Sequence, residues 1–98
     1  MSEPIYKLWL MKPKPEWYRL SKKEQDSLLE KVGATIDRVG GKLLISCRSS
    51  WSNEQWFGFG IEEYPSIEAA QKHDELIVEL NWPYEFADCF SILGTKIV

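Results

Sequence analysis

His73 is the residue of this 98-residue chain whose type best suits acid–base chemistry, and it is the only histidine. Imidazole titrates near neutral pH, so a histidine in a pocket can act as a catalytic proton acceptor or contact a ligand. Position 73 falls on the apolar stripe of a predicted helix, where the alternative is a core histidine hydrogen-bonded to a backbone carbonyl. Asp74 is adjacent, but neighbouring helical residues do not face each other, so no His73–Asp74 dyad is expected.

Two cationic residues, Lys7 and Arg48, interrupt otherwise apolar segments. Either could hold an anionic substrate or cofactor in a low-dielectric interior, and Arg48 is the candidate anion contact. The alternative, which the sequence favours, is that each lies at a strand end and reaches solvent or pairs with Glu62 across the sheet.

Three aromatic residues, Trp9, Trp56 and Tyr84, could line a pocket for a planar organic molecule. Packing within the fold or in a dimer explains them equally well. The aromatic content, with five Trp, four Tyr and four Phe, indicates more apolar surface than one small core needs.

The two cysteines, Cys47 and Cys89, form no CxxC motif, and one histidine with two distant cysteines argues against a structural zinc site. We expect inert free thiols and no metal. No signal-peptide pattern and no apolar run of about 20 residues is visible, so a cytoplasmic protein without a membrane contact is expected.

These residues must be positioned by a single domain over residues 1–98. Strands are predicted over 5–11, 42–48, 55–63 and 87–98, from apolar runs bounded by proline, glycine and polar residues. Helices are predicted over 21–39 and 66–80, because Ser21 and Glu24 form a capping box, Gly40 ends the first helix and Ser66 can cap the second.

This order of elements, β-α-β-β-α-β, is the ferredoxin-like plan, an α+β fold with a four-stranded antiparallel sheet. In that plan the two cysteine-bearing strands are opposite edges, too far apart for a disulfide. Two helices cover one sheet face and leave the other bare. We expect the bare face to carry Trp9 or Trp56, and Gly58 and Gly60 to make room for a bulky group lying across their strand.

Three segments are informative, namely Tyr6-Lys7-Leu8-Trp9, Glu16-Trp17-Tyr18-Arg19-Leu20-Ser21 and Asn81-Trp82-Pro83-Tyr84. Together they make the chain resemble the dimeric α/β-barrel superfamily of small ferredoxin-like proteins, in one of its uncharacterised families. The resemblance implies a homodimer through the sheet faces and a pocket between sheet and helices. Relatives include cofactor-independent monooxygenases, muconolactone-type isomerases, haem-handling proteins and many without an assigned activity. No catalytic motif of these groups is matched.

An RNA-recognition motif has the same order of elements, and Trp56-Phe57-Gly58-Phe59 is similar to its third-strand motif. The charge argues against that interpretation. Residues 1–48 hold 10 basic and 6 acidic groups, whereas residues 49–98 hold 2 basic and 9 acidic groups. The half with the supposed RNA-reading strand therefore has the wrong sign for phosphate, and no nucleic-acid partner is expected.

The sequence thus predicts a small protein that binds an aromatic or apolar organic molecule. If the protein is an enzyme, the resemblance implies monooxygenase- or isomerase-like turnover without a cofactor, with His73 as the proton acceptor. The alternative is a structural or regulatory homodimer without small-molecule chemistry.

Overall fold

The computed structural model describes residues 3–98 and contains a four-stranded antiparallel sheet with helices. The elements are β1 (Ile5–Pro13), α1 (Pro15–Arg19), α2 (Lys22–Arg38), β2 (Lys42–Arg48), β3 (Gly58–Tyr64), α3 (Ile67–Glu79), the π-helical turn η1 (Trp82–Phe86) and β4 (Ala87–Gly94). The α+β class is confirmed. No helix between residues 3 and 98 has both the length and the hydropathy of a membrane span.

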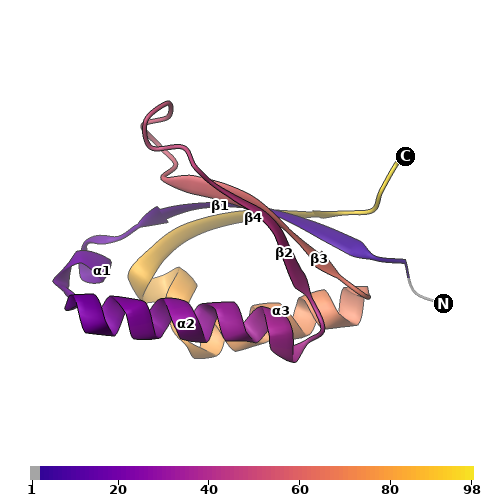
Figure 1. The fold of residues 1–98 in the computed structure, drawn as a ribbon, viewed down its shortest axis with the longest axis horizontal. Helices are drawn as coiled ribbons and strands as arrows, with labels where there is room; N and C mark the ends of the chain where they lie inside the picture. Colours follow the sequence, from indigo (N-terminus) through magenta and orange to yellow (C-terminus); the bar gives the residue numbers. More distant parts are fainter. Residues whose placement is uncertain (1–2) are drawn as a thin grey trace.

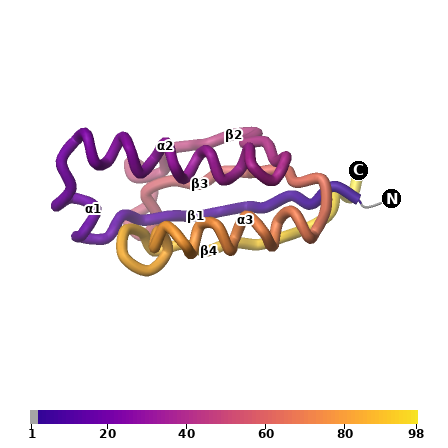
Figure 2. The backbone as a smooth tube through the Cα atoms, turned by 90° about the horizontal axis from the view of Figure 1, so that it is seen from below, coloured from indigo at the N-terminus to yellow at the C-terminus, as the bar shows by residue number. Residues whose placement is uncertain are grey.

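The sheet has the strand order β2-β3-β1-β4, so β2 and β4 are its edges. The two long helices, α2 and α3, lie on the same side of the sheet (Figure 1). Seen from the helical side, α2 runs along β2 and β3 while α3 runs along β1 and β4 (Figure 2). The register places Lys7 opposite Glu62 and Trp9 opposite Gly60. The two central strands therefore place Lys7, Trp9 and Glu62 on the helix-facing side of the sheet.

The main helices begin and end where the sequence predicts. The Glu24 amide donates to Ser21 Oγ at 3.1 Å and the Ser21 amide donates to the Glu24 carboxylate at 2.9 Å, which confirms the capping box of α2. Gly40, just after α2, has a left-handed φ of +76°, which glycine adopts without strain. At the start of α3 the Ala69 amide donates to Ser66 Oγ at 3.1 Å.

Several strand boundaries differ from the prediction, and β1 ends at Pro13 rather than at residue 11. β3 begins at Gly58 rather than at residue 55, because the Asn53 side-chain oxygen accepts from the amides of Gln55 (2.8 Å) and Trp56 (2.7 Å) and fixes a turn. β4 ends at Gly94 rather than at residue 98. No helix is predicted before residue 21, whereas the structure has α1 beginning at Pro15, because proline suits the first turn of a helix.

The two faces of the sheet differ from the expectation in one respect. Trp9 lies on the helix-facing side, with its ring across Gly60, and not on the bare face. The prediction that glycines make room for a bulky group is confirmed at Gly60, whereas a Cβ on Gly58 would meet the Cys47 backbone and no bulky side chain. The assignment of Trp9 and Trp56 to the bare face is wrong. Trp56 belongs to the loop before β3.

The bare face, called the open sheet face below, is aliphatic and phenylalanine-rich instead. Register and strand alternation put five side chains on it that are 36–52% exposed, namely Leu8, Ile45, Phe59, Phe90 and Ile92. The small buried core lies on the other side, where Tyr64 is fully buried against Ile36 and Ala70. Much apolar surface of this chain thus stays outside its own core.

Candidate functional site

A cavity of about 740 Å³ lies between the sheet and the helices. It is large enough for a small organic molecule, since ligand pockets usually measure about 300–1,000 Å³. Its apolar wall comes mainly from α2, α3 and η1: Leu29, Val32, Ile36, Ile77, Val78, Trp82 and Pro83. Its polar wall comes from the two central strands and α3, which bring Lys7, Glu62, His73 and Asp74 together.

Of the residues predicted for the site, the structure brings three to this cavity: His73, Trp9 and Arg48. Arg48 stands at the end of β2, where its guanidinium lies over the Phe57 ring at 5.3 Å. Trp56 and Tyr84 are not among the lining residues. The Tyr84 side chain lies on η1 and is 66% exposed.

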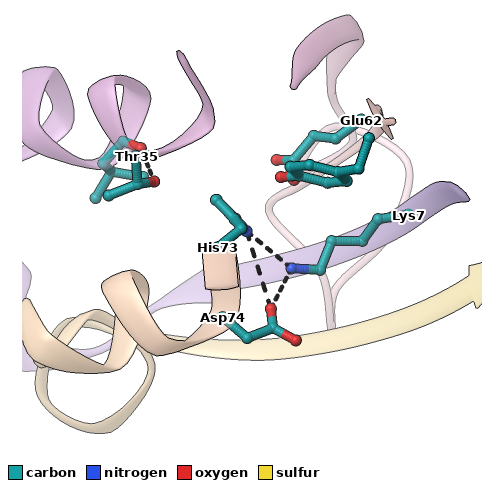
Figure 3. A network of polar contacts seen from close by, with 7 residues as sticks. Lys7, Thr35, Glu62, His73 and Asp74 are labelled. Carbon is teal, nitrogen blue, oxygen red and sulfur yellow. Dashed lines mark hydrogen bonds and ion pairs between the residues drawn. The ribbon is translucent and has the colours of Figure 1, made fainter. Parts of the chain in front are cut away.

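Lys7 is the centre of the polar cluster (Figure 3). Its ammonium contacts His73 Nδ1 at 3.1 Å and forms an ion pair with the Asp74 carboxylate. Lys7 is only 5% exposed, so the expected route to solvent is wrong, and its ion-pair partner is Asp74 rather than Glu62. His73 Nδ1 and Asp74 Oδ1 are 3.9 Å apart, because both face the same ammonium. Lys7 therefore connects two helical neighbours that do not bind each other directly.

The contact with Lys7 determines the form of His73. An ammonium can only donate, so Nδ1 accepts and the proton of the neutral ring lies on Nε2. His73 is 4% exposed, and its burial lowers its pKa to about 4, with the Lys7 charge acting in the same direction. At pH 7 this imidazole is neutral. Its partner is thus a lysine ammonium and not the backbone carbonyl considered from the sequence.

Glu62 and Tyr64 form a second polar pair beside this cluster. The Tyr64 hydroxyl donates to Glu62 Oε1 at 2.5 Å. Burial raises the pKa of Glu62, against the opposing effects of the Tyr64 hydrogen bond and the Lys7 charge. Burial also raises the pKa of Tyr64, so its hydroxyl keeps its proton and remains a donor. The Tyr64 ring lies 5.1 Å from the His73 ring, which joins both pairs into one cluster.

Two buried N–H groups in the cavity residues have no hydrogen-bond partner among residues 3–98. They are Trp9 Nε1 and His73 Nε2. A buried donor without an acceptor costs about 1–3 kcal/mol. An acceptor oxygen brought by a bound molecule, or by water, would recover this energy.

The cysteines lie on opposite edge strands, as predicted, and both are free thiols. Cys89 lines the cavity, and burial raises the pKa of its thiol, which keeps it protonated and weakly reactive. Within residues 3–98, no group of three or more His, Cys, Asp or Glu side chains could hold a metal ion.

The prediction missed Lys7 and Glu62 as one unit with His73. A signal existed, since Lys7 shares the parity of Trp9 on its strand and Glu62 shares the parity of Gly58 and Gly60. Charged residues in register with the positions that pack under helices indicate a buried polar cluster rather than a strand end.

Comparisons with known proteins find a similar fold in a protein of unknown function. No family model and no curated protein matches the chain. The crystal structure of RPA0582, a protein of unknown function from Rhodopseudomonas palustris, is similar with a TM-score of 0.67 and 19% identity over 100% of this chain and 85% of that one. The structure of methylated RPA0582 is similar with a TM-score of 0.66 and 17% identity over 100% and 84%. At such identities the likeness concerns the fold alone, which this chain therefore shares with proteins of unknown function.

Proposed function

We propose that this protein binds a small aromatic or apolar organic molecule in the cavity between sheet and helices. The cavity itself carries the proposal, because about 740 Å³ of apolar-walled space with a few convergent polar groups is typical of ligand sites. Trp9 forms a flat wall of the site, His73 and its neighbours form the polar end, and Arg48 stands at the end of β2 as an anion contact. Turnover in this site, as in the monooxygenase- and isomerase-like relatives that the sequence resembles, would use no cofactor.

The binding proposal is tested by filling the cavity from the helical side. Gly33 lines the cavity, and a Cβ placed on it meets no atom within 4 Å, so Gly33→Leu adds a side chain there without a clash at Cβ. Replacing glycine also favours the helix. We expect tetralin, indole and 2-tetralone to raise the melting temperature of the natural protein, and to bind Gly33→Leu at least tenfold more weakly by calorimetry.

Ala34→Leu is the matched control, because Ala34 is the next residue of α2 and does not line the cavity. It should bind the three compounds like the natural protein. Binding that survives in Gly33→Leu would move the ligand elsewhere. If none of the three compounds bound the natural protein, the proposal would be refuted, and the structural homodimer would be the better account.

We also propose that two copies pair through their open sheet faces in the manner of the dimeric α/β barrels. The support is the apolar character of the five open-face residues, since a contiguous exposed apolar patch of this kind marks an interaction surface. The ferredoxin-like arrangement of the superfamily, with β2 and β4 as edges, fits this pairing. A face that closes against a second copy would leave the helix-side cavity to the ligand.

Ile92→Glu is expected to separate this dimer. Ile92 is 52% exposed in the single chain and lies on the open sheet face, so the substitution would bury a carboxylate of each copy in the interface. We expect dissociation to be favoured by about 100-fold or more, measured by light scattering coupled to size exclusion against the 11.4 kDa chain mass. Ile67→Glu is the control, because Ile67 is similarly exposed, at 40%, at the first position of α3. A natural protein that elutes as one chain would contradict the pairing.

We further propose a reducing compartment, the cytoplasm, as the place of action. The support is the pair of free thiols at opposite edges of the sheet. Free thiols persist where glutathione and thioredoxin keep them reduced.

A further inference from the structure

We infer that Glu62 is the proton acceptor of this cavity, and that it removes a proton from the carbon next to the carbonyl group of an uncharged apolar ligand. The inference rests on the proposed binding function, and it assigns the reaction to a residue other than the one favoured by the sequence.

The position of Glu62 is the first observation. It lies on the central strand β3, lines the cavity and is 8% exposed (Figure 3). One carboxyl oxygen accepts the Tyr64 hydroxyl at 2.5 Å, while no donor within residues 3–98 binds the other oxygen. A carboxylate held on one side and free on the other is oriented for proton transfer.

The groups around Glu62 act on the pKa of its carboxyl group in opposite directions. Burial raises its pKa, and the Asp74 charge on α3 acts in the same direction. The Lys7 ammonium on β1 and the Tyr64 hydroxyl on β3 oppose this rise. The neighbouring His73 adds no charge at neutral pH, because its pKa is about 4. A carboxylate with a raised pKa is a stronger base than one in water, and the Lys7 charge favours its ionised form.

His73 is less suited to accept a proton. The lone pair of its Nδ1 faces the Lys7 ammonium at 3.1 Å, and its Nε2 carries the proton. The ring can therefore donate a hydrogen bond, and its proton-accepting atom is occupied. This is a second, independent reason to assign proton removal to Glu62.

The unpartnered N–H groups of Trp9 and His73 supply the complement of a base. Both belong to residues that line the cavity, and each is a donor without a partner within residues 3–98. Donors of this kind stabilise the negative charge that develops on a carbonyl oxygen when the adjacent carbon loses a proton. At this end of the cavity, away from the Arg48 anion contact, an uncharged group is favoured, because Asp74 already neutralises Lys7 and the Glu62 carboxylate repels an anion.

The step is balanced without a co-reactant. A C–H bond of the ligand breaks, its proton passes to the free Glu62 oxygen, and its electron pair moves toward the carbonyl oxygen to give an enolate. Return of a proton to the same carbon restores the ligand, and return to the far end of a conjugated enolate shifts a double bond. In D₂O the returning deuteron leaves a label.

The test uses 2-tetralone, whose benzylic carbon next to the carbonyl carries acidic protons. We expect the natural protein to accelerate deuterium exchange at that carbon, followed by NMR in D₂O, over buffer alone. Glu62→Gln can still accept the Tyr64 hydrogen bond through its amide oxygen, and it should bind 2-tetralone while the acceleration falls at least 100-fold. Glu63→Gln is the control, because Glu63 is the adjacent residue and points to the opposite face; it should exchange like the natural protein.

The outcomes separate this inference from the binding proposal. Acceleration retained in Glu62→Gln and lost in His73→Gln would return the role to His73 and overturn the inference. Ligands that raise the melting temperature without any acceleration of exchange would also overturn it, while ligand binding would stand. Absence of both binding and exchange would remove the two proposals together. If Glu62→Gln fails to fold, Glu62→Asp is the substitute variant. It keeps the carboxylate but withdraws it by one methylene group, so it should retain part of the acceleration.

Discussion

Gly60→Ala is expected to lower the free energy of unfolding by about 3 kcal/mol or more, although alanine is normally the better residue inside a strand. A Cβ atom at position 60 would lie 2.4 Å from Trp9 Cζ2 and 2.5 Å from the Ile45 carbonyl oxygen. The Trp9 ring could rotate away, but the Ile45 carbonyl belongs to the backbone of the neighbouring strand. Either β2 separates from β3 at this point, or Trp9 leaves its place in the cavity wall.

Urea denaturation at 25 °C measures this change, and Gly94→Ala is its control. Gly94 is the last residue of the paired strand β4, and a Cβ placed there meets no atom within 4 Å, so the effect of Gly94→Ala should remain within about 0.5 kcal/mol. Displacement of Trp9 should additionally weaken ligand binding in Gly60→Ala. A loss no larger than that of Gly94→Ala would mean that Trp9 does not lie across β3.

The glycines show how far the sequence reaches into this fold. Alternation along residues 55–63 predicts that Gly58 and Gly60 share a face and accommodate a bulky group, and the Trp9 ring confirms this for Gly60. Alternation gives only relative faces, however, and it does not say which face the helices cover. The sequence therefore predicts Trp9 on the bare face, because an exposed tryptophan would need a partner there.

The polar cluster was harder to predict than the fold. Helix caps and strand runs depend on residues a few positions apart, so Ser21, Gly40 and Ser66 mark the helix ends within the sequence itself. The contact of Lys7 with Asp74 joins residues 67 positions apart and depends on how α3 is placed over β1. A buried lysine also contradicts the general preference of lysine for the surface, which explains why a route to solvent was expected.

His73 is expected to make the protein less stable in acid by about 3 kcal/mol between pH 6.5 and pH 4. Burial and the Lys7 charge lower its pKa from 6.5 in the unfolded chain to about 4 in the fold. In this interval the unfolded chain binds a proton that the folded protein does not, so the free energy of unfolding falls with the pH. The contribution of His73 is complete above pH 6.5 and is lost as the pH falls through about 4, at about 1.4 kcal/mol per pKa unit.

The measurement must separate His73 from Glu62, whose raised pKa has the opposite sign and favours the fold in acid. His73→Gln serves as the reference, because its amide oxygen can accept from Lys7 and does not titrate. Relative to that of His73→Gln, the unfolding free energy of the natural protein should fall by about 3 kcal/mol from pH 7 to pH 4. Since the chain has one histidine, NMR of its imidazole protons gives the same quantity directly, with a midpoint near pH 4 in the fold and near 6.5 in urea. A midpoint above pH 6 in the folded protein would mean that the Lys7 ammonium does not face His73 Nδ1. The proton on His73 Nε2, which the assignment of Glu62 as the base uses, would then no longer be supported.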